Sequence, residues 1–379
     1  MIDEKILKTL CDKVEETTDD SWEDIKQQIG FMGSKDTLRK SWSAAPYGGY
    51  YIYQYLKDKN LGSSTADEIA RLQKAQDDEY KERCRLQDQN REKRKMLREE
   101  ARFEYLCDVL RDEMQNMVPI ALNPYKSAEK ADKVYATVMW SDWHCGDTAN
   151  NPWNLYNIEV MKQRAETLVN KTIDKIKLHG VTHLVIEING DMLDGVINVS
   201  SRVSQEADVV KQIVVLSEVV AQCANKIKPY VEDLKIVTTL GNHGRLGSNK
   251  RDWNVCENFE MLIPEFLKLR LDVPIKSSEG LDFTTYEIED KFICVAHGQY
   301  DKISTVIADF AKMYHITPDE IHIGHQHRYM DLDDCDISVT VNGSLIGSAD
   351  YALQCRKTNH PYQVMVIYGE DRCVYKISV

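Results

Sequence analysis

The chain has 379 residues, of which 42% are hydrophobic and 29% are charged, and its net charge is −13. This composition excludes collagen-like and low-complexity chains, and the length predicts two or three structural units. No apolar run reaches the roughly 18 residues that a helix needs to cross a bilayer, so we expect no membrane partner. The ten cysteines include no Cys-X-X-Cys pair, which favours reduced thiols in a cytoplasm over a zinc ribbon or a disulfide framework.

Residues 1–62 are predicted to be helical. Apolar residues recur at helical spacing near the N-terminus, and two further helices are indicated on either side of a Gly-containing turn at 31–33. Two helices joined in this way are typical of a helix-turn-helix, in which Lys35, Arg39 and Lys40 would be candidate nucleic-acid contacts. The alternative is an ordinary helical hairpin that docks on another surface.

Residues 63–132 are predicted to form a long, charged linker helix. The interval 66–116 contains neither Gly nor Pro and is dense in charges of both signs. From Lys81 to Arg102 there are nine basic and five acidic residues, so the middle of this helix is basic. Because its apolar residues keep no strict heptad, we expect a linker that can also join two copies into a homo-oligomer. A polar stretch after an Asn-Pro pair at 123–124 marks its boundary with the next domain.

Residues 133–379 alternate between short β-branched runs and amphipathic helical patterns. Strands are predicted at 134–140, 183–188, 234–240, 292–296 and 320–323, and helices at 157–179, 204–228, 255–270 and 303–314. This alternation predicts an α/β sheet with helices on its faces. After His327 strand follows strand, which suggests a second, antiparallel sheet.

Each of the five predicted strands ends in polar residues of the types that bind metals. They are Asp142 and His144, then Asp191, then Asn242 and His243, then His297, and finally His325 and His327. Ligands of open α/β sheets bind beyond the carboxyl ends of the strands, so these clusters can converge on one site. Asp142 and His144 occupy alternate positions of a segment predicted to be extended, which would point both at one ion.

The donor types indicate the chemistry. Carboxylate, imidazole and amide donors together suit Mn²⁺, Fe, Zn²⁺ or Ni²⁺ better than an all-oxygen Mg²⁺ site. A carboxylate such as Asp191 can bridge two ions. Two neighbouring ions lower the pKa of a water molecule and stabilise the charges of a phosphate undergoing displacement. The donor types therefore predict a metal centre that could activate a water molecule and orient a phosphate.

The ordered motifs Asp-X-His, Gly-Asp, Gly-Asn-His, His and Gly-His-X-His resemble those of the calcineurin-like metallophosphoesterase superfamily, in particular its nuclease and DNA-repair exonuclease branch. The resemblance covers about residues 133–350 and implies a two-sheet β-sandwich flanked by helices. It also implies two divalent metal ions, with Mn²⁺ expected before Fe, Zn²⁺, Ni²⁺ or Mg²⁺. One ion would be held by Asp142, His144, Asp191 and His327, and the other by Asp191, Asn242, His297 and His325. His243 would be the catalytic residue that acts on the phosphate or the leaving group.

The sequence departs from the family pattern directly after His243. Gly244 and Arg245 follow it, whereas the family usually has an acidic residue next to the histidine. Another group must therefore orient the imidazole. Arg245 could bind a substrate phosphate through its guanidinium fork, and Trp143 could stack on a base.

Three functions compete at this point. The leading hypothesis is a nuclease acting on DNA, supported by the helix-turn-helix pattern and the basic middle of the long helix. The second is a phosphodiesterase or phosphatase for a small nucleotide or other small phosphoester, favoured by the acidic catalytic half. The third is a non-catalytic nucleic-acid-binding or assembly protein, which the complete set of competent ligands disfavours. We expect a cytoplasmic protein, in the host cytoplasm if a phage encodes it.

Overall fold

The computed structural model describes residues 4–43, 65–125, 133–197, 206–247 and 257–379. The chain divides into two compact units, Met1–Ala101 and Arg102–Val379. No helix within the described ranges is both long and apolar enough to cross a membrane.

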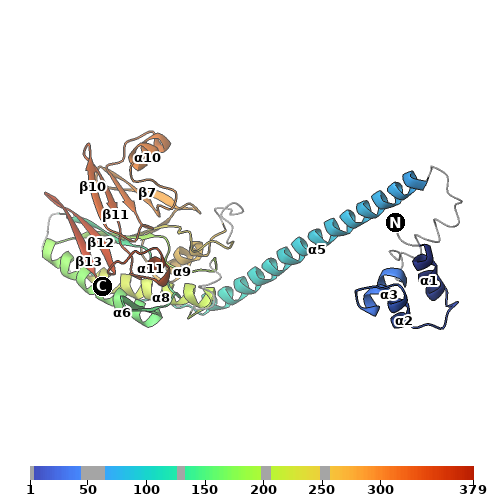
Figure 1. Ribbon diagram of the computed structural model, residues 1–379. Helices are drawn as coiled ribbons and strands as arrows, with labels where there is room; N and C mark the ends of the chain where they lie inside the picture. Colours follow the sequence, from blue (N-terminus) through green and yellow to red (C-terminus); the bar gives the residue numbers. More distant parts are fainter. Residues whose placement is uncertain (1–3, 44–64, 126–132, 198–205, 248–256) are drawn as a thin grey trace. The chain divides into compact units, whose positions relative to one another are not determined.

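Three short helices form the globular part of the first unit: α1 (Glu4–Val14), α2 (Trp22–Gln28) and α3 (Lys35–Ser43) (Figure 1). Leu10, Ile25 and Leu38, one from each helix, are buried against one another. Helix α2 starts at a capping box, in which the Ser21 hydroxyl accepts from the Asp24 N–H and the Asp24 carboxylate accepts from the Ser21 N–H. The predicted helices are confirmed, whereas the helix-turn-helix function stays a prediction.

Helix α5 spans Thr65–Gln115, which confirms the helix predicted over 66–116. From residue 71 to residue 98 its side chains are exposed, apart from the half-buried Cys84. A helix without Gly or Pro can persist over such a length because no residue interrupts its hydrogen-bond ladder.

The last turns of α5 are part of the packing of the second unit. Leu106, Val109 and Leu110 contact its hydrophobic core, and the N–H of Ile120 donates to the carbonyl of Arg270 at 2.8 Å. The core of the second unit therefore begins ahead of the compositional boundary at 123–132.

Two sheets form the body of the second unit. The larger has the strand order β13-β12-β1-β4-β5-β6 and the smaller β10-β11-β9-β8-β7. The larger sheet contains β1 (Tyr135–Trp140), β4 (His183–Asn189), β5 (Asp233–Thr239), β6 (Ile275–Ser277), β12 (Tyr362–Tyr368) and β13 (Arg372–Ser378). The smaller contains β7 (Phe283–Ile288), β8 (Lys291–Ala296), β9 (Glu320–Ile323), β10 (Met330–Asp334) and β11 (Ile337–Val341), and a separate hairpin joins β2 (Ala149–Asn151) to β3 (Asn154–Tyr156).

The predicted second sheet was wrong in its composition. Strands β12 and β13 join the first sheet, where β12 pairs antiparallel with β1. The smaller sheet combines β10 and β11 with β7, β8 and β9, and its three central strands are parallel. The order of strands along the chain does not fix which sheet edge each strand joins. Here β4 pairs with one edge of β1, and the C-terminal hairpin of β12 and β13 pairs with the other edge through β12.

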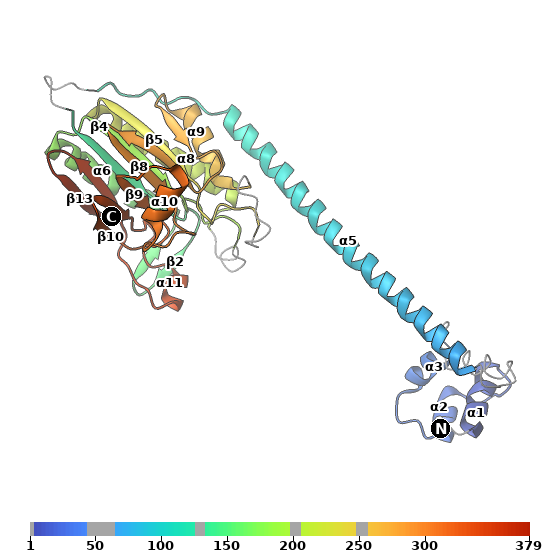
Figure 2. The same ribbon diagram turned by 90° about the horizontal axis from the view of Figure 1, so that it is seen from above.

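Helices cover the outer faces of the two sheets, as Figures 1 and 2 show. Helices α6 (Ile158–His179), α8 (Val209–Ile227) and α9 (Leu262–Arg270) pack on the larger sheet, and α10 (Val306–Tyr314) packs on the smaller. Shorter elements are α11 (Asp350–Gln354) and the 3₁₀ turns Lys228–Tyr230 and Phe259–Met261. The expected α/β sandwich flanked by helices is confirmed.

The alternation of side chains along the strands explains these layers. On β1, Val138 and Trp140 face the helices, whereas Met139 joins the core between the sheets. On β8, Val295 faces the larger sheet and Cys294 faces α10. Successive strand residues point to opposite faces, so a strand buried on both sides is mostly apolar along its whole length.

Candidate metal centre

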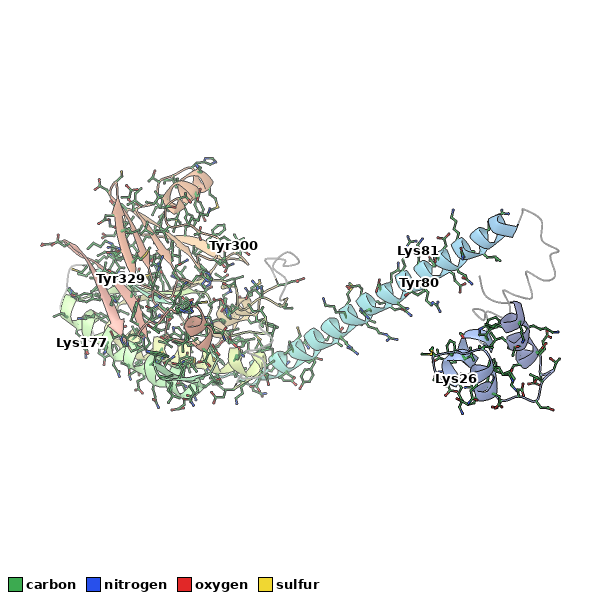
Figure 3. The ribbon with its side chains drawn as sticks, in the orientation of Figure 1. Lys26, Tyr80, Lys81, Lys177, Tyr300 and Tyr329 are labelled. Atoms are coloured by element: carbon green, nitrogen blue, oxygen red, sulfur yellow. The ribbon has the colours of Figure 1, made fainter. Side chains whose placement is uncertain are left out.

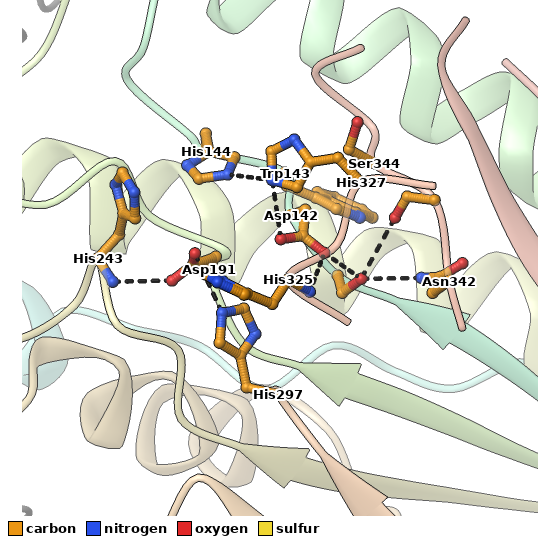
Figure 4. A network of polar contacts seen from close by, with 12 residues as sticks. Asp142, Trp143, His144, Asp191, His243, His297, His325, His327, Asn342 and Ser344 are labelled. Atoms are coloured by element: carbon orange, nitrogen blue, oxygen red, sulfur yellow. Dashed lines mark hydrogen bonds and ion pairs between the residues drawn. The ribbon is translucent and has the colours of Figure 1, made fainter. Parts of the chain in front are cut away.

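The polar residues at the ends of the five predicted strands meet at one place (Figure 4). Their potential ligand atoms form three overlapping groups, and within each group the atoms lie within 4.8 Å of one another. The groups are Asp142, His144 and His327; His144, Asp191 and His243; and Asp191, His297 and His325. The parallel strands of both sheets end at this edge, which is why residues more than 180 positions apart in sequence become neighbours.

The backbone at the site is left-handed at five of these residues. The φ angles are 56° at Asp142, 48° at His144, 51° at Asp191, 59° at His325 and 53° at His327. The extended geometry predicted for the first motif was therefore wrong, although its two side chains do converge. Each left-handed residue costs about 1 kcal/mol or more, and such strain is characteristic of functional sites.

Close approach of the strand ends requires glycine. A Cβ on Gly241 would overlap the backbone nitrogen of Asp191, and Gly190 itself has a φ of 79°. The chain can therefore bring the loops after β4 and β5 into direct contact only where these side chains are missing.

The first group of ligand atoms surrounds Asp142. Its Oδ1 atom lies 3.0 Å from Nε2 of His327, which in turn lies 3.2 Å from Nε2 of His144. Its Oδ2 atom accepts from the Ser141 hydroxyl at 2.6 Å and from the N–H of His325 at 3.0 Å. Asp142 and His144 are buried, and the His327 side chain is partly exposed.

The other two groups share Asp191. Its Oδ1 atom accepts from the N–H of His243 at 2.8 Å, and its Oδ2 atom lies 3.1 Å from Nε2 of His297. The Nδ1 atom of His297 lies 2.7 Å from the carbonyl of Asn189, so it donates there and leaves Nε2 directed at the cluster. The ring centroids of His297 and His325 are 5.0 Å apart.

The residues present fit divalent cations. Oδ1 of Asn242 is buried and has no hydrogen-bond partner among the described residues, and an unpaired buried oxygen costs about 1–3 kcal/mol. Two imidazole Nε2 atoms face each other in the first group, where a shared cation would satisfy both lone pairs. Carboxylate, imidazole and amide donors in one buried cluster are the donor set of transition-metal sites.

The surroundings shift the pKa values of the imidazoles in the cluster in opposite directions. Burial and the neighbouring His243 lower the pKa of His144 to about 3. Burial also opposes protonation of His297, but the charge of Asp191 outweighs it and raises the pKa of His297 to about 10. A cation that binds through Nε2 of His297 must therefore displace a proton.

Asp194 orients His243 and supplies the acid that the sequence lacks after this histidine. Nδ1 of His243 lies 3.2 Å from the Asp194 carbonyl and 3.5 Å from its Oδ1 atom. Burial opposes protonation of His243, but Asp191 and then Asp194 raise its pKa to about 9. Sequence analysis missed Asp194. Its signal is the Asp-X-X-Asp spacing, which places a second carboxylate three residues after Asp191.

Glu260 is a second residue that sequence analysis missed. Its Oε1 atom accepts from the N–H groups of Met192 and Leu193 at 2.6 and 3.1 Å, and its Oε2 atom accepts from that of Gly241 at 2.7 Å. This buried carboxylate thus joins the loop that carries Asp191 to the loop that carries Asn242 and His243.

The other predicted contacts lie as follows. Trp143 is fully buried, and its indole N–H donates to Gln363 at 3.2 Å, so its position does not support stacking on a substrate base. Arg245 is 6% exposed, and its Nε atom donates to the carbonyl of Gly247. Lys35, Arg39 and Lys40 are exposed on α3 in the other unit.

A buried ionic network lies between the two sheets. The two ring nitrogens of His322 lie 2.7 Å from Oε1 of Glu187 and 3.0 Å from Oε2 of Glu320. Glu187 also accepts from the side-chain amide of Asn189 at 3.0 Å. The backbone carbonyl of Asn189 in turn accepts from Nδ1 of His297. Arg372 donates to Glu320 at 3.1 Å. The network therefore links the core to the backbone that orients a candidate ligand.

This network predicts a pH-dependent stability. Burial lowers the pKa of His322, but the charge of Glu187 and the hydrogen bonds to Glu187 and Glu320 outweigh it and raise this pKa to about 9. The stabilising proton is bound fully below the unfolded pKa of about 6.5 and is lost as the pH rises through 9. Between these two pKa values, this group should therefore lower the free energy of unfolding of the wild-type protein by up to about 1.4 kcal/mol for each unit of pH increase.

Urea denaturation in the presence of a chelator measures this effect. His322→Gln should be less stable than wild type at pH 6.5, by about 3–5 kcal/mol because two buried carboxylates lose their cation. The gap should narrow toward pH 9. His360→Gln, an exposed histidine, is the matched control and should change neither stability nor its pH dependence. If the difference in stability between wild type and His322→Gln stays constant across this pH range, the titration belongs to another group.

No family model matches the chain. It is 22% identical over 322 residues to the SPbeta prophage-derived uncharacterized protein YonJ of Bacillus subtilis (strain 168), covering 81% of this chain and 77% of that protein. Among solved structures, it is similar to an archaeal phosphodiesterase (TM-score 0.33, 14% identity, 64% of this chain and 99% of that one). A predicted phosphoesterase of Streptococcus pneumoniae TIGR4 gives a TM-score of 0.31 at 11% identity, over 65% of this chain and 92% of that one. Similarity at this level does not bear on the chemistry of the site.

Proposed function

We propose that the chain is a metal-dependent phosphodiesterase that acts as a nuclease on DNA. The observation that carries the proposal is the overlap of the three ligand groups through His144 and Asp191. Two neighbouring cations need a ligand that serves both, and a carboxylate placed between two imidazole-containing groups provides one. Asp142, His144, Asp191 and His327 would hold the first cation, and Asp191, Asn242, His297 and His325 the second.

The bound cations would supply a water of lowered pKa and would neutralise charge on the phosphate. The residues of the chain provide the remaining steps. In the chain without cations, the charges of Asp191 and Asp194 raise the pKa of His243 to about 9. A protonated His243 would attract the phosphate and donate a proton to the departing oxygen. Asp194, which contacts Nδ1 of this ring, leaves Nε2 for the substrate. The ring centroids of His243 and His144 lie 4.6 Å apart in a T-shaped contact, which supports a role for His243 next to the cations.

DNA is favoured as the substrate by features outside the centre. Exposed cations lie on α3 and along the middle of α5, and a nucleic acid needs such sites because residues 133–379 carry 25 basic and 34 acidic residues. The acidic second unit favours the alternative, a small phosphodiester that needs no basic surface.

One assay decides between these functions. Full-length protein should cleave single- or double-stranded DNA with Mn²⁺, less with Mg²⁺ and not with EDTA, as followed on labelled oligonucleotides. RNA, a cyclic dinucleotide and bis-p-nitrophenyl phosphate are the comparison substrates. Cleavage of the small diesters without cleavage of DNA would replace the nuclease by the small-molecule enzyme. If no substrate is cleaved in the presence of any of the metals, the result would support the non-catalytic alternative.

A further inference from the structure

The basic residues of α5 are not spread evenly around the helix. Successive residues of an α-helix advance by about 100°. On that geometry Arg83, Arg91, Arg94, Lys95 and Arg98 fall within about 120° of the circumference, and all five side chains are exposed. We call these five residues the basic stripe. Side chains along this helix are drawn in Figure 3.

Acidic residues occupy the rest of the circumference. Between Arg83 and Arg98, Asp88 and Glu92 both project outside the arc of the basic stripe. On that other side, Lys81 pairs with Asp78 at 3.4 Å and Arg85 with Glu82 at 3.6 Å. Within the described part of the chain, no ion pair involves the basic stripe. The five side chains of the stripe are exposed to solvent, and the Arg83 guanidinium also lies 5.8 Å from the centroid of the Tyr80 ring.

We propose that the basic stripe binds the phosphate backbone of DNA. Arg83 to Arg98 spans about 22 Å along the helix axis, and a duplex presents one phosphate per about 1.7 Å of its axis. Four of the five cations are arginines, whose planar fork matches a phosphate in a bidentate manner. The inference rests on the proposed function, because it names the surface that brings the substrate to an acidic catalytic unit.

Other occupants fit the stripe less well. A membrane-binding helix needs an apolar face opposite its charges, whereas the other side of α5 carries acids and paired lysine and arginine. A second copy of the helix would bring like charges together if the basic stripes of the two copies packed on each other. Because the stripe is defined by charge alone, it should read the backbone and not the base sequence.

Two triple variants of the full-length protein test the proposal. The stripe variant combines Arg91→Gln, Arg94→Gln and Arg98→Gln. The control combines Lys81→Gln, Arg85→Gln and Lys93→Gln, which removes the same charge from the same helix outside the stripe. Glutamine has nearly the helix propensity of arginine and lysine, so both helices should persist in circular dichroism.

Binding of a fluorescein-labelled DNA duplex is measured by anisotropy in EDTA, where no cleavage is expected. The stripe variant should bind about 10- to 500-fold more weakly at 0.1 M salt, and its slope of log K against log salt should fall by up to about 2.7. The control should change the affinity by less than about threefold. Both variants should hydrolyse bis-p-nitrophenyl phosphate like wild type.

The outcomes separate the two proposals. Equal losses in both variants, or unchanged affinity in the stripe variant, would overturn the basic stripe as a DNA-binding surface. Binding to anionic vesicles is measured for the same proteins. A stripe variant that loses its binding to vesicles but keeps its binding to DNA would also overturn the proposal, in favour of a membrane-binding surface. If DNA binds through the stripe but no metal supports its cleavage, the nuclease is wrong and the binding surface stands.

Discussion

Asp191→Ala should abolish phosphodiesterase activity and reduce bound metal from two ions to at most one. Asp191 belongs to two of the three ligand groups, whereas Asp142, the other carboxylate of the cluster, belongs to one. Its Oδ2 atom lies 3.1 Å from Nε2 of His297, and its Oδ1 atom fixes the N–H of His243. Removing it takes a ligand from both cations and releases the loop of the catalytic histidine. We expect a loss of at least about 10³-fold in kcat/KM, or about 4 kcal/mol of transition-state stabilisation.

The measurements are metal content by mass spectrometry and hydrolysis of bis-p-nitrophenyl phosphate. Asp174→Ala is the matched control, since Asp174 is exposed on α6, and it should retain both ions and full activity. A variant Asp191→Ala that binds two ions and turns over substrate like wild type would show that the centre has been assigned to the wrong residues.

His243→Ala should keep both ions and lower the rate by about 10² to 10⁴, the usual range for a lost acid or base. The His243 ring is held by Asp194 and is partly exposed, whereas His297 is completely buried and directed at Asp191. His297→Ala and His325→Ala should therefore lose metal as well as activity. Titration calorimetry with Mn²⁺ and the turnover of the chromogenic diester distinguish the two kinds of defect.

The same series tests an alternative that the geometry leaves open. His243, His144 and Asp191 form a ligand group of their own, so His243 could itself hold a cation. Equal metal loss in all three variants would make it a ligand. If it is the acid, substrates with a leaving group of low pKa should suffer less from His243→Ala, because they need no proton to depart.

Local signals located the helices and strands, although α8 and α9 begin at Val209 and Leu262 and not at the predicted 204 and 255. Helical spacing and capping residues located α1, α2 and α3, and the absence of Gly and Pro located α5. Five strands of the second unit begin and end within a residue or so of their predicted positions, since buried strands are continuous β-branched runs. The hairpin strand β7, with its Thr-Thr-Tyr-Glu pattern, carried a weaker signal and was not predicted.

Pairing between strands could not be read in this way. Strand β12 is as apolar as β4 or β5, so its pattern specifies burial on both faces and not a neighbour. Which edge accepts it depends on the packing of helices and sheets that lie far apart in sequence. Only the folded chain shows that it completes the larger sheet.

The sequence by itself determined which residues could form the centre, because ligand types and glycines at strand ends are local features that few other requirements produce. Tertiary structure decided how these residues are held. The left-handed backbone at Asp142 and His144, the Asp194 contact to His243 and the Glu260 bridge between two loops all depend on groups brought together across strands. A buried carboxylate finds its partners only where the two sheets and their loops meet, since its charge must be neutralised or hydrogen-bonded by whatever the fold places beside it.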